Sequence, residues 1–225
     1  MDEALRVREF WFGPMLKSRP GTKSSRSPSG VSASRATELN RRVELWFGGD
    51  ATPPELRAQH DAAIRAEFSG LVERAASGTL AGWADSPRRR LSLIILLDQF
   101  PRNIYRGSAR AFAFDTQALA LTLSGMQSAA DAALEVVERI FFYMPLQHAE
   151  SGEVQDESVA AYRRVQAEAP AELQSFFASS LRSAEHHRSI IEQFGRFPHR
   201  NQALNRASTP EEERWLAKAG ERFGQ

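Results

Sequence analysis

The fold is decided by residues 86–101, SPRRRLSLIILLDQFP. The opening Ser-Pro pair favours a helix start, because serine can cap exposed backbone amides and proline is well tolerated at the first helical position. Residues 91–97 are almost all apolar, and this run is far shorter than the roughly 20 residues that a membrane span needs. We therefore predict a helix over residues 88–100 at the centre of a globular core, ended by Pro101.

Further helices are predicted on both sides of this core helix, and no segment alternates apolar and polar residues as a strand would. About ten helices with short links predict an all-α fold without a sheet, built of antiparallel helix pairs as a bundle or a tetratricopeptide-like superhelical stack. The predicted helices are one opened by Pro53-Pro54, one capped by Ser108 and running to Ser124 with Gly125 beyond it, Leu134 to Met144 stopped by Pro145, a Ser151-capped stretch through Ala167, Ala171 to Phe194 closed by Gly195, and a last one begun by the capping box Thr209-Pro210-Glu211-Glu212.

Residues 17–35 differ in composition from the rest of the chain, because they are mostly Ser, Arg, Lys, Pro, Gly and Thr. Such a composition cannot offset the entropy lost on ordering, so we predict a mobile basic loop. Two short helical segments flank it, Phe10-Trp11-Phe12-Gly13 and Leu45-Trp46-Phe47-Gly48, each ending in a glycine suited to a helix C-terminus. Residues 1–225 are expected to form one helical domain around this loop.

Composition excludes several functions. The net charge is only +1, so neither nucleic acid nor an anionic membrane is favoured as a partner. The chain contains no cysteine, which removes thiolate chemistry and fits the cytoplasm. Adjacent His186 and His187 point about 100° apart on a helix and do not form a chelating pair, and no nucleotide-binding or zinc-protease motif is present. No metal and no cofactor are expected.

Polar residues gather in three clusters beside the most apolar segments, and they are the candidate site. A carboxylate at the end of the core helix needs a cationic or backbone partner, a histidine near a carboxylate can act as an acid or base, and arginines beside the predicted helix start at Pro198 favour an anion. The candidate ligand-binding residues are Asp98, Gln99, Arg102, Asn103, Arg106, His148, His187, Arg196, His199, Arg200 and Asn201, and the candidate catalytic residues are His148, Glu150 and His199.

Three interpretations of these clusters stay open. They can form a pocket that holds a small anionic ligand or the acidic end of a peptide from a protein partner. Alternatively, they can form the active site of an enzyme that acts on a small carboxylated or phosphorylated molecule, with His148 or His199 as acid or base and Arg196 and Arg200 stabilising negative charge. The third interpretation is structural, because Asp98, Glu150 or Asp115 can pair with the arginines and fix the helix corners.

These clusters and the paired Trp-Phe-Gly segments resemble a bacterial family of unknown function, DUF924. The resemblance implies a helical, tetratricopeptide-like fold and brings no activity, cofactor or catalytic residue with it. The matching stretches are Phe10-Trp11-Phe12-Gly13, Trp46-Phe47-Gly48, Leu96-Leu97-Asp98-Gln99-Phe100-Pro101-Arg102-Asn103, Ala111-Phe112 with Asp115, Pro145 with His148 and Glu150, His187-Arg188, and Phe194-Gly195-Arg196-Phe197-Pro198-His199-Arg200-Asn201 through Ser208-Thr209-Pro210-Glu211-Glu212.

Overall fold

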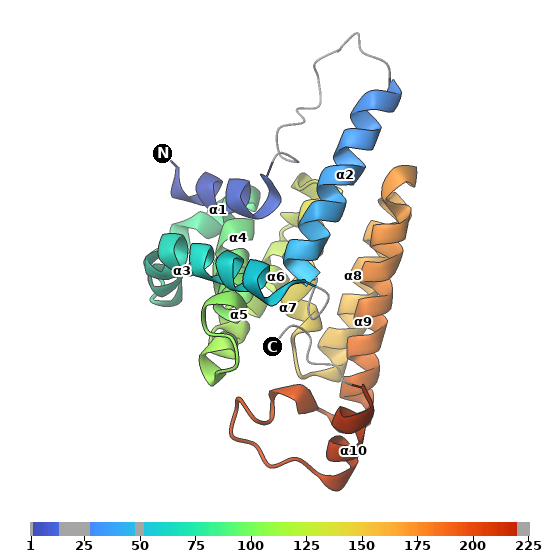
Figure 1. The fold of residues 1–225 in the computed structure, drawn as a ribbon. Helices are drawn as coiled ribbons and strands as arrows, with labels where there is room; N and C mark the ends of the chain where they lie inside the picture. The colour runs from blue at the N-terminus through green and yellow to red at the C-terminus, as the bar shows by residue number, and fades with distance from the viewer. Residues whose placement is uncertain (1, 14–27, 48–51, 220–225) are drawn as a thin grey trace.

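A computed structural model describes residues 2–13, 28–47 and 52–219, and these residues form helices and no strand (Figure 1). The prediction of an all-α fold is confirmed. The α-helices are α1 (Glu3–Phe12), α2 (Pro28–Phe47), α3 (Pro54–Ala76), α4 (Pro87–Ile94), α5 (Phe100–Ile104), α6 (Asp115–Gln127), α7 (Val136–Gln147), α8 (Gly152–Glu168), α9 (Gln174–Phe194) and α10 (Pro210–Ala219), with 3-10 turns at Ala81–Asp85, Ala109–Phe112, Asp131–Ala133, Ala171–Leu173 and Pro198–Arg200. None of the helices described here is long and apolar enough to cross a membrane.

The core helix does not end at Pro101 as predicted. It continues from α4 through a π-helical turn, Ile95–Gln99, into α5, and the amide of Phe100 donates to the carbonyl of Ile95. The π-turn resets the hydrogen-bond register, so that Pro101 falls in the first turn of α5, where its missing amide costs little. This turn carries Asp98 and Gln99, and π-turns of this kind are frequent at functional sites.

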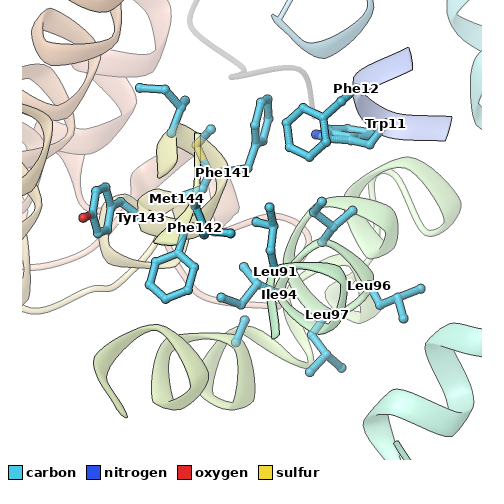
Figure 2. Packing of buried hydrophobic residues seen from close by; sticks show 14 of the residues in the cluster. Trp11, Phe12, Leu91, Ile94, Leu96, Leu97, Phe141, Phe142, Tyr143 and Met144 are labelled. Carbon is cyan, nitrogen blue, oxygen red and sulfur yellow. The ribbon is translucent and has the colours of Figure 1, made fainter. Parts of the chain in front are cut away.

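The apolar face of α4 packs at the centre of the molecule. Leu91 and Ile94 are fully buried and lie opposite Phe141 and Phe142 of α7 (Figure 2). Trp11 of α1 closes the other side of Phe141, with ring centroids 5.4 Å apart. One buried apolar cluster therefore joins the N-terminal helix to the core helix and to α7.

Two further helix boundaries differ from the predictions because tertiary packing overrides local signals. Pro145 lies inside the last turn of α7, where it removes one i→i−4 hydrogen bond without ending the helix. The helix predicted from Ser108 begins only at Asp115 and includes Gly125. A Cβ at Gly125 would lie 2.5 Å from Cζ of Phe142, so the glycine allows α6 and α7 to approach closely.

The predicted loop over residues 17–35 is wrong for its second half, because residues 28–35 belong to α2. Residues 17–27 lie outside the described part of the chain, as does Gly48. Once residues 37–47 are packed against the core, each residue added to the helix start gains a backbone hydrogen bond. Composition alone misses this effect.

The C-terminal half forms successive neighbours. α8 packs against α7 and α9, and α8 and α9 lie side by side (Figure 1). Gly195 ends α9 in the left-handed conformation, with φ of 67°, and the capping box of Thr209 and Glu212 begins α10, both as predicted. A tetratricopeptide-like superhelix stays a prediction that these contacts do not test.

Candidate functional site

The site is built around a hydrogen bond between Asp98 and His148. Asp98 is fully buried in the π-turn, His148 caps the C-terminus of α7, and Asp98 Oδ1 lies 2.6 Å from His148 Nδ1. The second oxygen of Asp98 accepts a hydrogen bond of 2.5 Å from Gln99 Nε2. The carboxylate therefore fixes the imidazole ring with its proton on Nδ1 and leaves Nε2 as the basic nitrogen.

Burial and charge set the protonation of this pair. Burial raises the pKa of Asp98, but the charges of His148 and Arg102 and the hydrogen bonds from His148 and Gln99 outweigh it and lower the pKa to about 2. Burial lowers the pKa of His148 and the positive charge of Arg102 lowers it further, and the charge of Asp98 and its hydrogen bond do not fully offset this decrease. At neutral pH the pair is thus a carboxylate and a neutral imidazole.

Two arginines from distant parts of the chain share Asp115, at the start of α6. Arg102 binds it with both terminal guanidinium nitrogens, Nη1 and Nη2, each at 2.9 Å, and Nη1 also donates to the backbone carbonyl of Asp98 at 2.6 Å. Arg200 reaches the same carboxylate at a longer distance, 3.4 Å. Its guanidinium lies between the rings of Phe112 and Phe197, at 4.7 Å and 4.6 Å from their centroids.

Arg200 is the less well satisfied of the two. Its side chain is 7% exposed, and its Nε is buried without a hydrogen-bond acceptor among the described residues. Burial and the nearby charge of Arg102 lower the pKa of Arg200 to about 10, so the group stays protonated at neutral pH. An unpaired buried donor is costly, by about 1–3 kcal/mol, and it is a place where an acceptor would bind favourably.

Two more histidines extend the cluster. His187 of α9 lies 6.4 Å from His148 between ring centroids and donates from Nδ1 to the carbonyl of Ser183 at 2.8 Å. Phe197 contacts the rings of both His187 and His199, at 5.6 Å and 5.4 Å. Burial lowers the pKa of His187 to about 3, and burial together with Arg200 lowers that of His199 to about 2. Both rings are neutral at physiological pH.

We define the His/Arg cluster as the set of residues that these contacts bring together from the π-turn, α5, the C-terminus of α7, the start of α6, the second half of α9 and the 3-10 turn after α9. The side chains of Arg102, His148 and Asp115 are partly accessible to solvent, at 11%, 14% and 19% exposed. The negative charges of the two carboxylates in this cluster, Asp98 and Asp115, formally balance the positive charges of its two guanidiniums, Arg102 and Arg200. The members of the cluster are Asp98, Arg102, Asp115, His148, His187, His199 and Arg200.

Asn103 and Arg106, also predicted to bind a ligand, lie outside this cluster. Both donate to Asp61 of α3, with Asn103 Nδ2 at 2.9 Å and Arg106 Nε at 2.9 Å. Their hydrogen bonds join α5 to α3. Asp61 was missed by sequence reasoning, because an aspartate inside an amphipathic helix carries no signal that distinguishes it from a solvated one.

The remaining predicted residues fasten the segment before α10. Arg196 binds Glu212 with two hydrogen bonds of 2.6 Å and 2.8 Å, and Asn201 Nδ2 reaches the same carboxylate at 3.2 Å. Glu150 accepts from the amide of Phe197 at 2.8 Å and from Arg206 at 2.7 Å. This segment lies at one end of the molecule (Figure 1). Sequence reasoning missed Arg206, which no motif marks.

Metal binding finds no support in the part of the chain that is described, since no group of three or more His, Asp or Glu side chains there could hold an ion. The arrangement suits two other tasks. The guanidinium of Arg200 can bind a carboxylate or phosphate oxygen, and the oriented imidazole of His148 can accept a proton.

Lowering the pH from about 7 to about 5 is expected to destabilise the protein through the buried histidines. Unfolded histidine titrates near pH 6.5, whereas His187 and His199 in the folded protein have pKa values of about 3 and about 2. Between these pH values the unfolded state binds more protons than the folded state. Each such histidine therefore lowers the free energy of unfolding by about 1.4 kcal/mol for every unit by which the pH falls below 6.5. Urea unfolding at several pH values measures how the free energy of unfolding changes with pH.

The His187→Gln variant tests this assignment. Its free energy of unfolding should change less steeply with pH than that of wild type below about pH 6.5, and equally steeply above it. Equal pH dependence throughout would refute the assignment.

Fold and site together define an all-α protein in which buried and half-buried aspartates, arginines and neutral histidines from several helices meet. The chain belongs to the DUF924 family of bacterial proteins of unknown function, whose model matches residues 7–220. It is similar to the solved structure of a protein of unknown function, ATU0120 from Agrobacterium tumefaciens, with 32% sequence identity and a TM-score of 0.67 over 84% of this chain and 98% of that one. No curated protein matches the chain. The predicted family membership is confirmed.

Proposed function

We propose that the His/Arg cluster binds a small anionic molecule, with Arg200 as its main donor. The observation that carries this proposal is the state of Arg200: a protonated guanidinium, buried between two phenyl rings, with an unpartnered Nε and one shared carboxylate at 3.4 Å. An oxygen acceptor from a ligand supplies the missing hydrogen bond.

Charge limits the class of ligand. Arg102 and Arg200 are already offset by Asp98 and Asp115, and the histidines are neutral. A polyanion such as nucleic acid would therefore meet no excess of positive charge. A single carboxylate, on a metabolite or at the end of an acidic peptide of a protein partner, fits better than a phosphate dianion, which Asp98 and Asp115 would repel.

The protein's expected setting agrees with this function. The chain contains no cysteine, which fits a reducing compartment, and small carboxylates are abundant metabolites there. We therefore assign the binding function to the cytoplasm.

Calorimetry and thermal unfolding with butyrate, succinate and inorganic phosphate test the proposal. Butyrate, which carries one carboxylate, should raise the melting temperature by mass action and bind more tightly than phosphate. The Arg200→Gln variant should bind it at least about tenfold more weakly, equivalent to about 1.4 kcal/mol.

The matched control is Arg188→Gln, which removes a more exposed arginine of α9 that pairs with Asp156 and Glu192. This variant should bind butyrate as wild type does. Failure of all three anions to stabilise the wild-type protein, or equal binding by wild type and Arg200→Gln, would contradict the proposal. Circular dichroism confirms that each variant is folded before its affinity is compared.

A further inference from the structure

The Asp98–His148 pair has a feature that ligand binding alone does not require. A buried carboxylate held 2.6 Å from Nδ1 of a neutral imidazole is the arrangement that prepares a histidine as a base. A histidine that served only to line a binding pocket would need no such buried charge, which is unfavourable without partners. Asp98 keeps its charge through Gln99 and Arg102, at 2.5 Å and 3.4 Å.

The proton that this base removes comes from water. Among the residues that the structure describes, no serine or threonine hydroxyl is hydrogen-bonded to His148, and the chain has no cysteine. The side chain of His148 is 14% exposed, so part of it is in contact with solvent. A base without a protein nucleophile activates water for hydrolysis.

Arg200 supplies the second requirement. A substrate that carries a carboxylate can place it on this buried guanidinium, and the bound carboxylate then holds the ester in position for attack by water. The unpartnered Nε of Arg200 lies within the same cluster as His148, connected to it through His187 and Phe197.

We propose that the His/Arg cluster is a hydrolytic active site for small esters that carry a carboxylate, with His148 as the general base and Asp98 as its positioning residue. His148 Nε2 takes a proton from water while the water oxygen bonds to the ester carbonyl carbon, and the carbonyl π pair moves onto the carbonyl oxygen to form the tetrahedral oxyanion. When the intermediate collapses, the ester C–O bond breaks and the leaving alkoxide takes the proton from His148. Ester and water become acid and alcohol, with no redox change. The choice of a carboxylated substrate rests on the anion-binding function proposed above.

The test compares two esters of equal chain length, mono-4-nitrophenyl adipate with a free carboxylate and 4-nitrophenyl hexanoate without one. The full-length protein should hydrolyse the adipate half-ester above the buffer rate and with a kcat/KM about tenfold higher than that for the hexanoate. The His148→Gln variant should lose about 100-fold or more of this activity. Arg188→Gln, away from the cluster, should keep it.

Asp98→Asn separates positioning from a structural role. Asparagine can donate to Nδ1 and so favours the tautomer with its proton on Nε2, which abolishes the base. We expect a large fall in kcat with little change in KM. Because the Asp98 charge raises the pKa of His148, the acid limb of the remaining activity should also move to lower pH. A variant damaged only in folding would lose activity without moving this limb.

Each outcome decides one of the two proposals. No hydrolysis above buffer by a wild-type protein that binds butyrate overturns the active site and leaves the binding function intact. Equal hydrolysis by wild type and His148→Gln also overturns it. A third outcome is that hydrolysis depends on His148, the two esters react equally and the protein does not bind butyrate. This result overturns the carboxylate-binding function, and with it the carboxylated substrate class.

Discussion

Replacing Glu138 with alanine is expected to lower the free energy of unfolding by about 3–5 kcal/mol. Glu138 of α7 pairs with Arg8 of α1, and the two side chains are 2% and 8% exposed. Arg8 Nε donates to Glu138 Oε1 at 3.2 Å, and the second carboxylate oxygen accepts from the amide of Glu135 at 3.0 Å, closing the capping box of α7. The alanine variant leaves the guanidinium buried without its partner and removes half of the cap.

The double replacement Arg8→Met with Glu138→Leu is the control. It removes both charges and fills similar volume with apolar atoms, so it should recover most of the lost stability. Urea unfolding followed by tryptophan fluorescence measures all three proteins. A double variant as unstable as Glu138→Ala would show that the loss comes from the cap and the packing, and not from the unpaired arginine.

Replacing Phe141 with alanine, in a different part of the core, is expected to lower the free energy of unfolding of the wild-type protein by about 3–5 kcal/mol. The ring of Phe141 contacts four aromatic rings, with centroid distances of 5.4 Å to Trp11, 5.5 Å to Phe12, 4.6 Å to Trp46 and 5.8 Å to Phe47. It is the residue of α7 on which the two Trp-Phe segments of α1 and α2 converge. Truncation leaves a cavity between three helices that cannot collapse without moving two of them.

Phe141→Leu keeps an apolar side chain of similar reach and should cost roughly 1.5 kcal/mol or less. Near-ultraviolet circular dichroism should show a loss of tryptophan signal in the alanine variant, because Trp11 and Trp46 lose their common neighbour. If alanine and leucine destabilise the protein equally, the aromatic cluster does not hold α1 and α2 in place.

Local sequence signals predicted the helices but not all of their ends. The capping box at Thr209 and the glycine at Gly195 were found correctly, because these signals act within one turn of the chain. Pro101 and Pro145 gave wrong helix ends. The π-turn places Pro101 in the first turn of α5, where no amide donor is needed, whereas Pro145 is tolerated inside α7 close to the C-terminus of that helix. Neither condition is visible without the three-dimensional hydrogen-bond pattern.

The candidate site was predicted as a set of residue types and not as a geometry. Asp98 and His148 were both singled out, but their pairing spans 50 residues of sequence and depends on where α7 ends relative to the core helix. The structure also separates residues that the sequence had grouped together. Arg196 and Asn201 contact Glu212, whereas Arg200, their near neighbour, turns toward Asp115. Which of several adjacent cations is already paired depends on tertiary contacts alone.

The role of Arg200 as the anion donor is tested most directly at its Nε, by following the Nε–Hε signals of the arginines in a proton–nitrogen NMR spectrum while butyrate is added. The Arg200 signal is assigned as the one that disappears in Arg200→Gln. We expect this signal to move downfield and to saturate with the dissociation constant found by calorimetry, while the signals of Arg188 and Arg196 stay in place. An Arg200 signal that does not move while butyrate binds would contradict this role of Arg200, since the anion would then lie elsewhere on the protein.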